Sequence, residues 1–481
     1  MSNLFSRGFD KKPSYFKQSE GSSMLASYIP TKDTISVPIV PDKITLDAQQ
    51  ELIVNSTEKN IVVVAGAGSG KTRVLTERIR HLIEDLNVPP CNIVSITFTN
   101  AAAEEMKIRL SDINTIGDAF IGTIHSFANR IMKESGEKYT LFTDELDTQL
   151  HRELINKYCE HLTIERYLAY KDLKSEVDMG KADEKVLMDF FTPSENSDFS
   201  MLHYSCRQVY EDLEQDTHLT FGESIKTLCK KRNIITFDEL LVKAKDYFEK
   251  IQAKIEYVFV DEFQDVGTLE YNFIKSLNAD NYFFVGDDFQ SIYGFKGGNV
   301  RIFKSLVSDI DYHAYYLTNN YRNGISILNL ASYVIGQVED KIEKTIVPIS
   351  SESGNVVIQT KRNISGVLYS LKNKKDSYKD WFILVRTNKE LFEMADRCQQ
   401  LNIPYTSFKR EGMSYSELKE RLALNCVKIL TVHTSKGLEA DNVILYGNFP
   451  LNVPYYRKND DERKVMYVGI TRARKNLIIL N

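Results

Sequence analysis

The segment AGAGSGKT at residues 65–72 restricts the fold more than any other part of the chain. It joins the β-branched run NIVVV to the amphipathic pattern RVLTERIRHLI, which is typical of a helix. Its glycines allow backbone N–H groups to turn inward around phosphate oxygens, and the helix that follows adds the positive end of its dipole. Only Ala65 departs from the phosphate-loop pattern G-x-x-x-x-G-K-[ST]. The segment therefore predicts a nucleotide site at a strand–loop–helix turn.

Two side chains at the end of this loop have distinct expected roles. Lys71 would reach the β- and γ-phosphates, and the hydroxyl of Thr72 would coordinate Mg²⁺. A glycine-rich turn that only packs would not need this Lys–Thr pair. We therefore expect ATP and Mg²⁺ as cofactors, with the nucleotide held by Ala65, Gly66, Ala67, Gly68, Ser69, Gly70, Lys71 and Thr72.

Strand-like and helical patterns alternate along most of the chain, which predicts an α/β fold with parallel sheets. The first series uses residues 41–130 and resumes at 251–320 with the runs YVFV and YFFV. Residues 131–250 are rich in Glu, Asp, Lys and Tyr and indicate a helical insertion in this first domain. The runs VVIQT, WFILV, VKILTV, NVILY and NLIIL predict a second domain over residues 321–481. Residues 1–40 have no sustained period and are expected to form an N-terminal tail.

The segment YVFVDEFQDV places two adjacent carboxylates at the end of an apolar strand. Asp261 would hold Mg²⁺ through water, together with Thr72, and Glu262 would orient or deprotonate the attacking water. Because parallel strands end at one edge of a sheet, these groups should lie near the phosphate loop. Hydrolysis at such sites also needs an arginine, and the candidates are Arg322 in LTNNYRNG and Arg472 in YVGITRAR.

Composition excludes several classes of protein. The formal net charge of −5 does not exclude nucleic acid, because binding depends on the local patch of charge. No apolar run approaches the roughly 20 residues that cross a bilayer, so we expect no membrane partner. The six cysteines are scattered without a C-x-x-C pair, which argues against a zinc site or disulfide framework. We expect the cytoplasm of a bacterial or virus-infected cell, and a monomer.

Ten segments in order resemble the motifs of the UvrD/Rep-like branch of superfamily 1 DNA helicases. They are LDAQQ, AGAGSGKTR, TFTNAAAEEM, GTIHSF, TFDEL, DEFQD, GDDFQSIYGF, NNYRN, TVHTSKGLEA and YVGITRAR. The resemblance covers residues 46–481. It implies two RecA-like P-loop domains and ATP-driven translocation along single-stranded DNA in the 3′→5′ direction, with single-stranded DNA and its junctions with duplex as partners.

The resemblance also implies roles for individual residues. At the nucleotide, Gln50 would read the adenine edge, Arg73 and Tyr321 would sandwich the adenine, and Glu439 would lie near the ribose. Gln290 would sense the γ-phosphate, with Arg322 and Arg472 as arginine fingers. On the same loop, Phe295 would stack on a base, where the family usually has tryptophan, and Lys296 would hold a phosphate. The other expected DNA contacts are Phe98, Thr99, Asn100, Thr123, His125, Thr431 and His433.

The chain departs from the family pattern in three places. Only about two dozen residues join Tyr405 to Val427, where relatives usually carry a large helical insertion. We therefore expect a compact form that lacks most of this subdomain, and unaided unwinding is in doubt. Ala101 stands where lysine is common, and the sequence stops soon after the strand-like run KNLIIL.

Three functions fit these observations. The first is an ATP-dependent 3′→5′ DNA helicase of replication, repair or recombination, with a protein partner from one of these processes. The second is a single-stranded DNA translocase that displaces proteins and unwinds only with a partner. The third, from another class, is an adaptor that binds DNA in an ATP-dependent way without motor activity. A pure binder would not need the full set of hydrolysis residues: Lys71, Asp261, Glu262, Gln290, Arg322 and Arg472.

Overall fold

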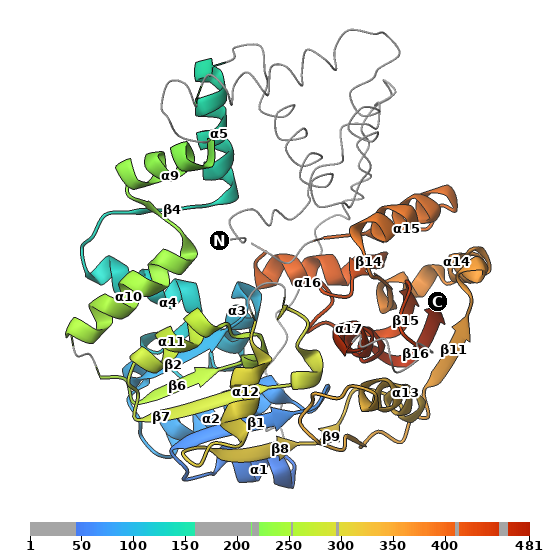
Figure 1. The fold of residues 1–481 in the computed structure, drawn as a ribbon. Helices are drawn as coiled ribbons and strands as arrows, with labels where there is room; N and C mark the ends of the chain where they lie inside the picture. Colours follow the sequence, from blue (N-terminus) through green and yellow to red (C-terminus); the bar gives the residue numbers. More distant parts are fainter. Residues whose placement is uncertain are drawn as a thin grey trace. The chain divides into compact units, whose positions relative to one another are not determined.

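The computed structural model describes residues 45–158, 213, 221–251, 254–294, 298–408, 413–451 and 460–481. The chain divides into two compact units. The larger unit, residues 40–132 and 241–481, contains two parallel sheets of six strands each (Figure 1).

The first sheet carries the phosphate loop. Its strand order is β3-β2-β6-β7-β1-β8, and all its pairings are parallel. The strands are β1 (Asn60–Ala65), β2 (Ile93–Thr97), β3 (Phe120–Thr123), β6 (Tyr257–Val260), β7 (Asn281–Gly286) and β8 (His313–Leu317). The helices that follow the strands or precede β1 are α1 (Ala48–Val54), α2 (Lys71–Glu84), α3 (Asn100–Arg109), α11 (Thr268–Ser276) and α12 (Val300–Val307). Five of the six residues of β1 are buried, as expected for a central strand covered on both faces.

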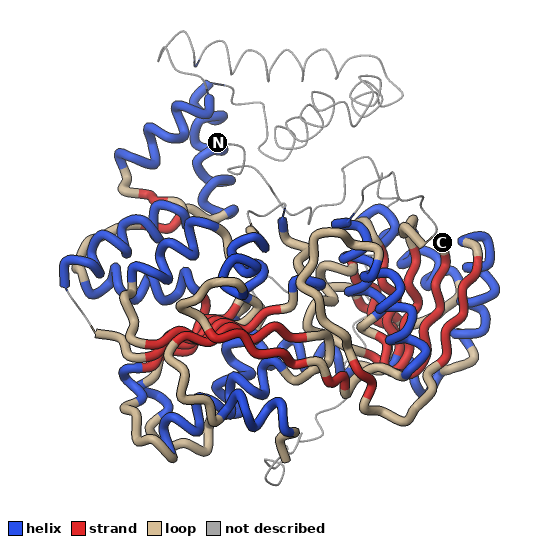
Figure 2. The backbone as a smooth tube through the Cα atoms, turned by 60° about the horizontal axis from the view of Figure 1, so that its bottom comes forward, coloured by secondary structure: helices blue, strands red, loops and turns tan. Residues whose placement is uncertain are grey.

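The second sheet has the order β11-β16-β15-β12-β14-β13 and is also parallel. Its strands are β11 (Asn355–Gln359), β12 (Trp381–Val385), β13 (Tyr405–Thr406), β14 (Val427–Thr431), β15 (Ala440–Tyr446) and β16 (Ala473–Leu480). Helices α13 (Ile325–Gly336) and α17 (Asp460–Ile470) share one hydrophobic core with the sheet. Helices α14 (Ile364–Lys372) and α15 (Asn388–Gln400) share another. Alternate residues of β12 enter the two cores, so these helix pairs cover opposite faces (Figure 2).

The smaller unit comprises residues 1–39 and 133–240. Its described helices are α5 (Asp144–Tyr158) and α9 (Phe221–Lys231), and the short strands β4 (Thr140–Leu141) and β5 (Ile234–Ile235) pair in parallel. The boundaries of this unit along the chain fall within helices α4 (Ile124–Glu134) and α10 (Phe237–Ile251). The expected tail at residues 1–40 lies outside the described residues, as does most of 159–220.

The predicted fold class, an α/β protein with two parallel-sheet domains, is confirmed. The domain boundaries at residues 40, 130, 250 and 320 stay predictions. Sequence patterns missed β8 and the two-residue pair β9 (Asn319–Asn320) and β10 (Val347–Pro348). Between residues 405 and 427 the described structure holds one helix, α16 (Tyr415–Ala423), besides the strand ends. Among the described residues, no helix is both long and apolar enough to span a bilayer.

Candidate active site

The phosphate loop connects β1 to α2 and adopts a conformation that requires glycine at two positions. Gly68 and Gly70 have φ values of 65° and 83°, and Gly70 is the N-cap of α2. A Cβ atom on Gly68 would lie 2.7 Å from the Cβ of Arg322. The hydroxyl of Ser69 donates a 2.8 Å hydrogen bond to the carbonyl of Gly66, which closes the loop on itself. The N–H groups at the start of α2 are thereby presented to an anion.

The segment after β8 ties this loop in place. The N–H of Gly66 donates to the Leu317 carbonyl at 2.9 Å. The amide of Asn320 donates to the Ala67 carbonyl at 2.7 Å, and the N–H of Tyr321 donates to the Gly68 carbonyl at 3.0 Å. These three bonds place the residue that follows, Arg322, beside the loop.

Two carboxylates end β6 next to the loop. The hydroxyl of Thr72 donates to Oδ2 of Asp261 at 3.2 Å. Glu262 has φ 52°, a strained value for a residue with a side chain, and its N–H donates to Oδ1 of Asp261. Burial and the adjacent Glu262 charge raise the pKa of Asp261. Burial also opposes ionisation of Glu262, but the Lys71 and Lys436 cations outweigh it and lower the pKa of that carboxyl.

The chemistry of this cluster fits a divalent cation. Hydroxyl and carboxylate oxygens are the ligands that Mg²⁺ prefers, and Thr72 and Asp261 bring one of each within hydrogen-bond distance. Burial and the neighbouring Glu262 charge disfavour the ionised form of Asp261, which is why its pKa is raised although Lys71 acts in the opposite direction. A cation bound there would favour the ionised form of this carboxyl.

Gln290 and Arg472, predicted to act on the same phosphate, are in direct contact. An Nη of Arg472 donates to Oε1 of Gln290 at 3.1 Å, and Nε2 of Gln290 donates to Asp287 at 2.7 Å. Arg472 is only 1% exposed, and its other bonds go to Thr471 and to main-chain carbonyls. Burial and the nearby Arg322 charge lower the pKa of Arg472 to about 9. Arg472 and Arg322 are both positively charged, and two cations this close together favour an anion beside them.

Each of the other residues predicted to bind the nucleotide has a hydrogen-bond partner in the structure. Arg322 is paired with Glu439, with Nε 2.5 Å from the carboxylate, so these two are brought together. Gln50 is buried and donates to the Ser69 carbonyl at 3.1 Å. Arg73 donates to the Thr45 carbonyl at 2.7 Å. Tyr321 is 45% exposed and its hydroxyl contacts Asp47, so its ring is accessible for stacking.

Sequence reasoning missed a lysine that links the two sheets. Lys436, in the segment TVHTSKGLEA, forms an ion pair with Asp265 and lies 3.7 Å from Glu262. Its ammonium also donates to the Gln290 carbonyl at 2.9 Å. Gln264 completes this network, because its amide donates to Glu262 and its oxygen accepts from the N–H of Asp287. The sequence offered one signal for Lys436: it precedes a glycine in the motif TVHTSKGLEA, which begins at the end of a predicted strand.

A second missed lysine holds the loop that carries Gln290. Lys344 lies 2.8 Å from Asp287 and 2.6 Å from Asp288, and all three side chains are fully buried. Its ammonium also lies 3.8 Å from the ring centre of Phe289. Nothing in the polar stretch VEDKIEK indicated a buried cation.

A row of rings lies beside this loop. Phe98 and Tyr293 stack with centroids 5.1 Å apart, and Tyr293 lies 6.0 Å from the His433 ring. The Tyr293 hydroxyl donates to the His433 carbonyl at 3.1 Å. Phe98 and His433 were predicted DNA contacts, whereas Tyr293 was missed. Its position three residues after Gln290, in a loop suspected of binding DNA, was the signal.

Other predicted DNA contacts lie at strand ends of the two sheets. Thr99 caps α3, where Asn100 is the first residue. Thr123 ends β3 and is paired in register with Thr97 of β2, and His125 follows in α4. Thr431 ends β14, two residues before His433, and its hydroxyl is 2.9 Å from that of Thr434. Phe295 and Lys296 lie outside the described residues.

Two parallel α/β sheets, with a phosphate loop on the first and buried arginine on the second, define a P-loop protein with two RecA-like domains. The chain belongs to the UvrD/Rep-like helicase family. Residues 46–311 match the UvrD/REP helicase N-terminal domain, and residues 408–481 match the UvrD-like helicase C-terminal domain.

Individual relatives are similar over most of this chain. It is 28% identical over 423 residues to the ATP-dependent DNA helicase PcrA of Leuconostoc citreum, covering 83% of this chain and 54% of that protein. It is 28% identical over 470 residues to a probable DNA helicase of Mycoplasma pneumoniae, covering 91% and 83%. PcrA of a Staphylococcus epidermidis strain is 28% identical over 406 residues, covering 78% and 52%. The chain thus spans about half the length of these PcrA relatives.

Proposed function

We propose that the protein is an ATP-dependent DNA helicase that translocates 3′→5′ along single-stranded DNA. The observation that carries the proposal is that one short loop contacts both candidate sites. Gln290 contacts Arg472 at the phosphate end, and Tyr293, three residues on, stacks on Phe98 and lies beside the tilted ring of His433. A loop of this kind would transmit the state of the nucleotide to the DNA.

The residues of the first sheet would bind and position ATP. Lys71 and the N–H groups of the loop would hold the β- and γ-phosphates, and Glu262 would orient the attacking water. Glu262 is suited to this role because nearby cations keep its carboxyl ionised. Bound Mg²⁺, held by Thr72 and Asp261, would neutralise charge on the phosphates.

The second sheet would supply positive charge to the transferring phosphate. Arg472 already contacts Gln290, whereas Arg322 would have to release Glu439. Arg322 lies beside the phosphate loop in the segment between the two sheets, and Arg472 directly precedes β16 of the second sheet, so closure of the two sheets around ATP would complete the site.

The DNA strand would lie along the strand ends that carry Phe98, Tyr293 and His433. Stacking of bases on aromatic rings tolerates any sequence, which suits a motor that visits every base. The 3′→5′ direction rests on membership of the UvrD/Rep-like family. We propose a monomeric cytoplasmic motor of replication, repair or recombination with a protein partner in that pathway.

One observation favours a second function, a translocase that displaces proteins but needs a partner to unwind. The connection from β13 to β14 contains the single described helix α16. The N–H of Tyr415 at its start donates to the carboxylate of Glu104 at 2.7 Å, so the start of this helix contacts α3, which follows strand β2 of the first sheet. Little chain is left there to grip duplex DNA.

Strand separation distinguishes the two functions. Duplexes with a 3′ tail, a 5′ tail or no tail would be incubated with protein, ATP and Mg²⁺, beside an assay of protein displacement from single-stranded DNA. A helicase unwinds the 3′-tailed duplex only. A translocase displaces the protein and leaves all three duplexes intact, and unwinding from a 5′ tail would contradict the proposed direction.

A further inference from the structure

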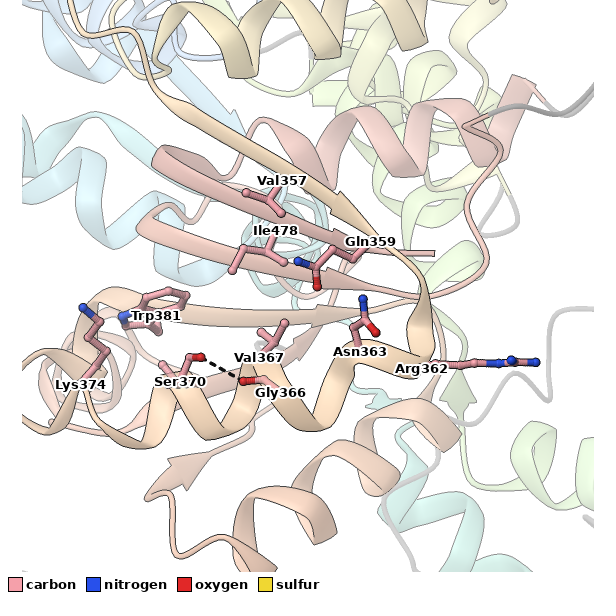
Figure 3. A pocket seen from close by; sticks show the side chains of 11 residues that line it. Val357, Gln359, Arg362, Asn363, Gly366, Val367, Ser370, Lys374, Trp381 and Ile478 are labelled. Atoms are coloured by element: carbon pink, nitrogen blue, oxygen red, sulfur yellow. Dashed lines mark hydrogen bonds between the residues drawn. The ribbon is translucent and has the colours of Figure 1, made fainter.

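The face of the second sheet that carries α14 and α15 is incompletely covered beside its edge strand. A groove of about 550 Å³ lies between α14 and the strands β11 and β16. In Figure 3, Val357, Gln359 and Ile478 project from the strands, and Val367 and Ser370 face them from the helix. We call this the α14 groove. It shares no residue with the candidate active site.

The lining of the α14 groove has an apolar wall, the uncharged polar side chains of Gln359, Asn363 and Ser370, and a cationic residue near each end. Its apolar wall is formed by Val357, Val367, Leu371, Trp381 and Ile478. Arg362 lies at one end, where its exposed side chain points outward in Figure 3, and the exposed Lys374 lies at the other end. No carboxylate lines the groove, and neither cation forms an ion pair with another residue in the described part of the chain. This charge pattern favours an anionic occupant with an apolar part.

Gly366 supports the interpretation that the α14 groove is an open binding surface. It lies within α14, where glycine is a poor helix former. A Cβ atom there would meet nothing within 4 Å, and the backbone has no positive φ. Neither conformation nor close packing therefore requires glycine. Its effect is to leave the flank of α14 open where the groove passes.

We propose that the α14 groove binds an extended acidic segment of a partner protein. Helix α14 has nine residues. At 1.5 Å per residue it is about 13 Å long, and Arg362 and Lys374 lie two residues beyond its ends, so the two cations are too far apart for one small anionic group. An extended chain needs at least about four residues, at roughly 3.3 Å each, to cover the length of the helix. Because side chains alternate, acids at positions i and i+4 and an apolar residue at i+2 share one face.

The apolar wall distinguishes a peptide from nucleic acid as the occupant. Single-stranded nucleic acid is bound by basic grooves with several stacking rings, whereas this groove has one aromatic residue among aliphatic side chains. The segment recognised is therefore of the form acidic–x–apolar–x–acidic, with the apolar side chain over Gly366.

Trp381 makes occupancy directly measurable, because it is the single tryptophan of the chain. The probe is the peptide acetyl-GSDSLSDSG-amide, and the readout is Trp381 fluorescence without ATP or DNA, so the result is independent of the proposed helicase activity. We expect a saturable change that weakens at higher salt. The same peptide with both aspartates replaced by lysine should have no such effect, and a short oligonucleotide should have no effect that depends on the groove.

Two variants and a matched control complete the test. Gly366→Leu would fill the groove, and the Arg362→Glu, Lys374→Glu double variant would reverse its charge. Each should weaken peptide binding at least tenfold. Gly336→Leu is the control, because Gly336 ends α13 on the opposite face and its Cβ would also meet nothing within 4 Å. The proposal is overturned by no saturable change with the peptide or by equal binding of the lysine peptide. It is also overturned if Gly366→Leu binds the peptide as wild type does, or if the oligonucleotide gives a response that Gly366→Leu abolishes.

Discussion

The guanidinium of Arg472 donates a 3.1 Å hydrogen bond to the side-chain oxygen of Gln290, although the two residues are 182 positions apart. Gln290 lies between β7 and α12 of the first sheet's domain, and Arg472 directly precedes β16 of the second sheet. Both polar groups are buried, so this bond forms in a place where an unpaired group would be costly. A change in the charge beside Gln290 would therefore alter a contact that joins the two sheets.

The first prediction concerns the phosphate loop. Lys71→Ala removes the ammonium that would contact the β- and γ-phosphates, and ATP turnover should fall at least about 100-fold. Binding of single-stranded DNA should persist, because the predicted DNA contacts lie elsewhere. Phosphate release and fluorescence anisotropy measure the two properties. Lys59→Ala, at an exposed lysine just before β1, is the control. Equal turnover in Lys71→Ala and wild type would remove this lysine from the site.

The second prediction concerns the buried cation at Lys344. Lys344→Met leaves Asp287 and Asp288 without their partner, and loss of one member of a buried ion pair costs about 3–5 kcal/mol. Urea unfolding should show a loss of this size. Lys475→Met breaks a solvent-exposed pair with Asp441 and should cost far less, because water already screens such a pair. Similar losses in both variants would mean that Lys344 does not hold the loop.

The third prediction concerns acid stability. Burial and the nearby Arg386 charge lower the pKa of His433 from 6.5 to about 4. Below pH 6.5 the unfolded chain binds a proton that the folded protein does not bind until about pH 4. Stability present above pH 6.5 is therefore lost as the pH falls through this window. His433→Gln should lose less stability than wild type between about pH 7 and about pH 4.5 in urea unfolding. His313→Gln, at an exposed histidine, should follow wild type.

The fourth prediction concerns the row of rings. Tyr293→Ala removes the ring between Phe98 and His433 and should weaken single-stranded DNA binding by about 1–3 kcal/mol, or roughly 5- to 150-fold. Anisotropy with a labelled oligonucleotide measures the effect. Tyr333→Ala, on the exposed side of α13, should bind normally. If both tyrosine variants bind alike, the row is a structural contact only.

The sequence predicted features carried by contiguous residues, and it missed those made by the fold. The loop at residues 65–72 and the pair Asp261–Glu262 stand out because a few adjacent residues determine both conformation and chemistry. Lys344 could not be found, because its polar neighbours are typical of a solvated loop and only its tertiary position buries it. Strands β8, β9 and β10 were missed for a related reason, since β8 is a partly exposed edge strand and β9 and β10 have only two residues each.

Aromatic residues illustrate the same limit within one loop. The segment QSIYGF contains two rings, and the resemblance to helicases directed attention to Phe295. Phe295 lies outside the described residues and stays a prediction, whereas the described part of the loop brings Tyr293 against Phe98 and His433. These contacts join positions more than a hundred residues apart. Contacts of that kind depend on the order of strands in both sheets, which periodicity does not specify.

The most direct test of the account is ATP hydrolysis with and without single-stranded DNA, measured in wild type, Gln290→Ala and Arg472→Ala. The account predicts that DNA strongly stimulates the wild type. It also predicts that both variants lose the stimulation and at least about 100-fold of the turnover while still binding DNA. A wild-type rate that does not respond to DNA, or variants that respond as wild type does, would contradict the claim that this contact couples the two sites.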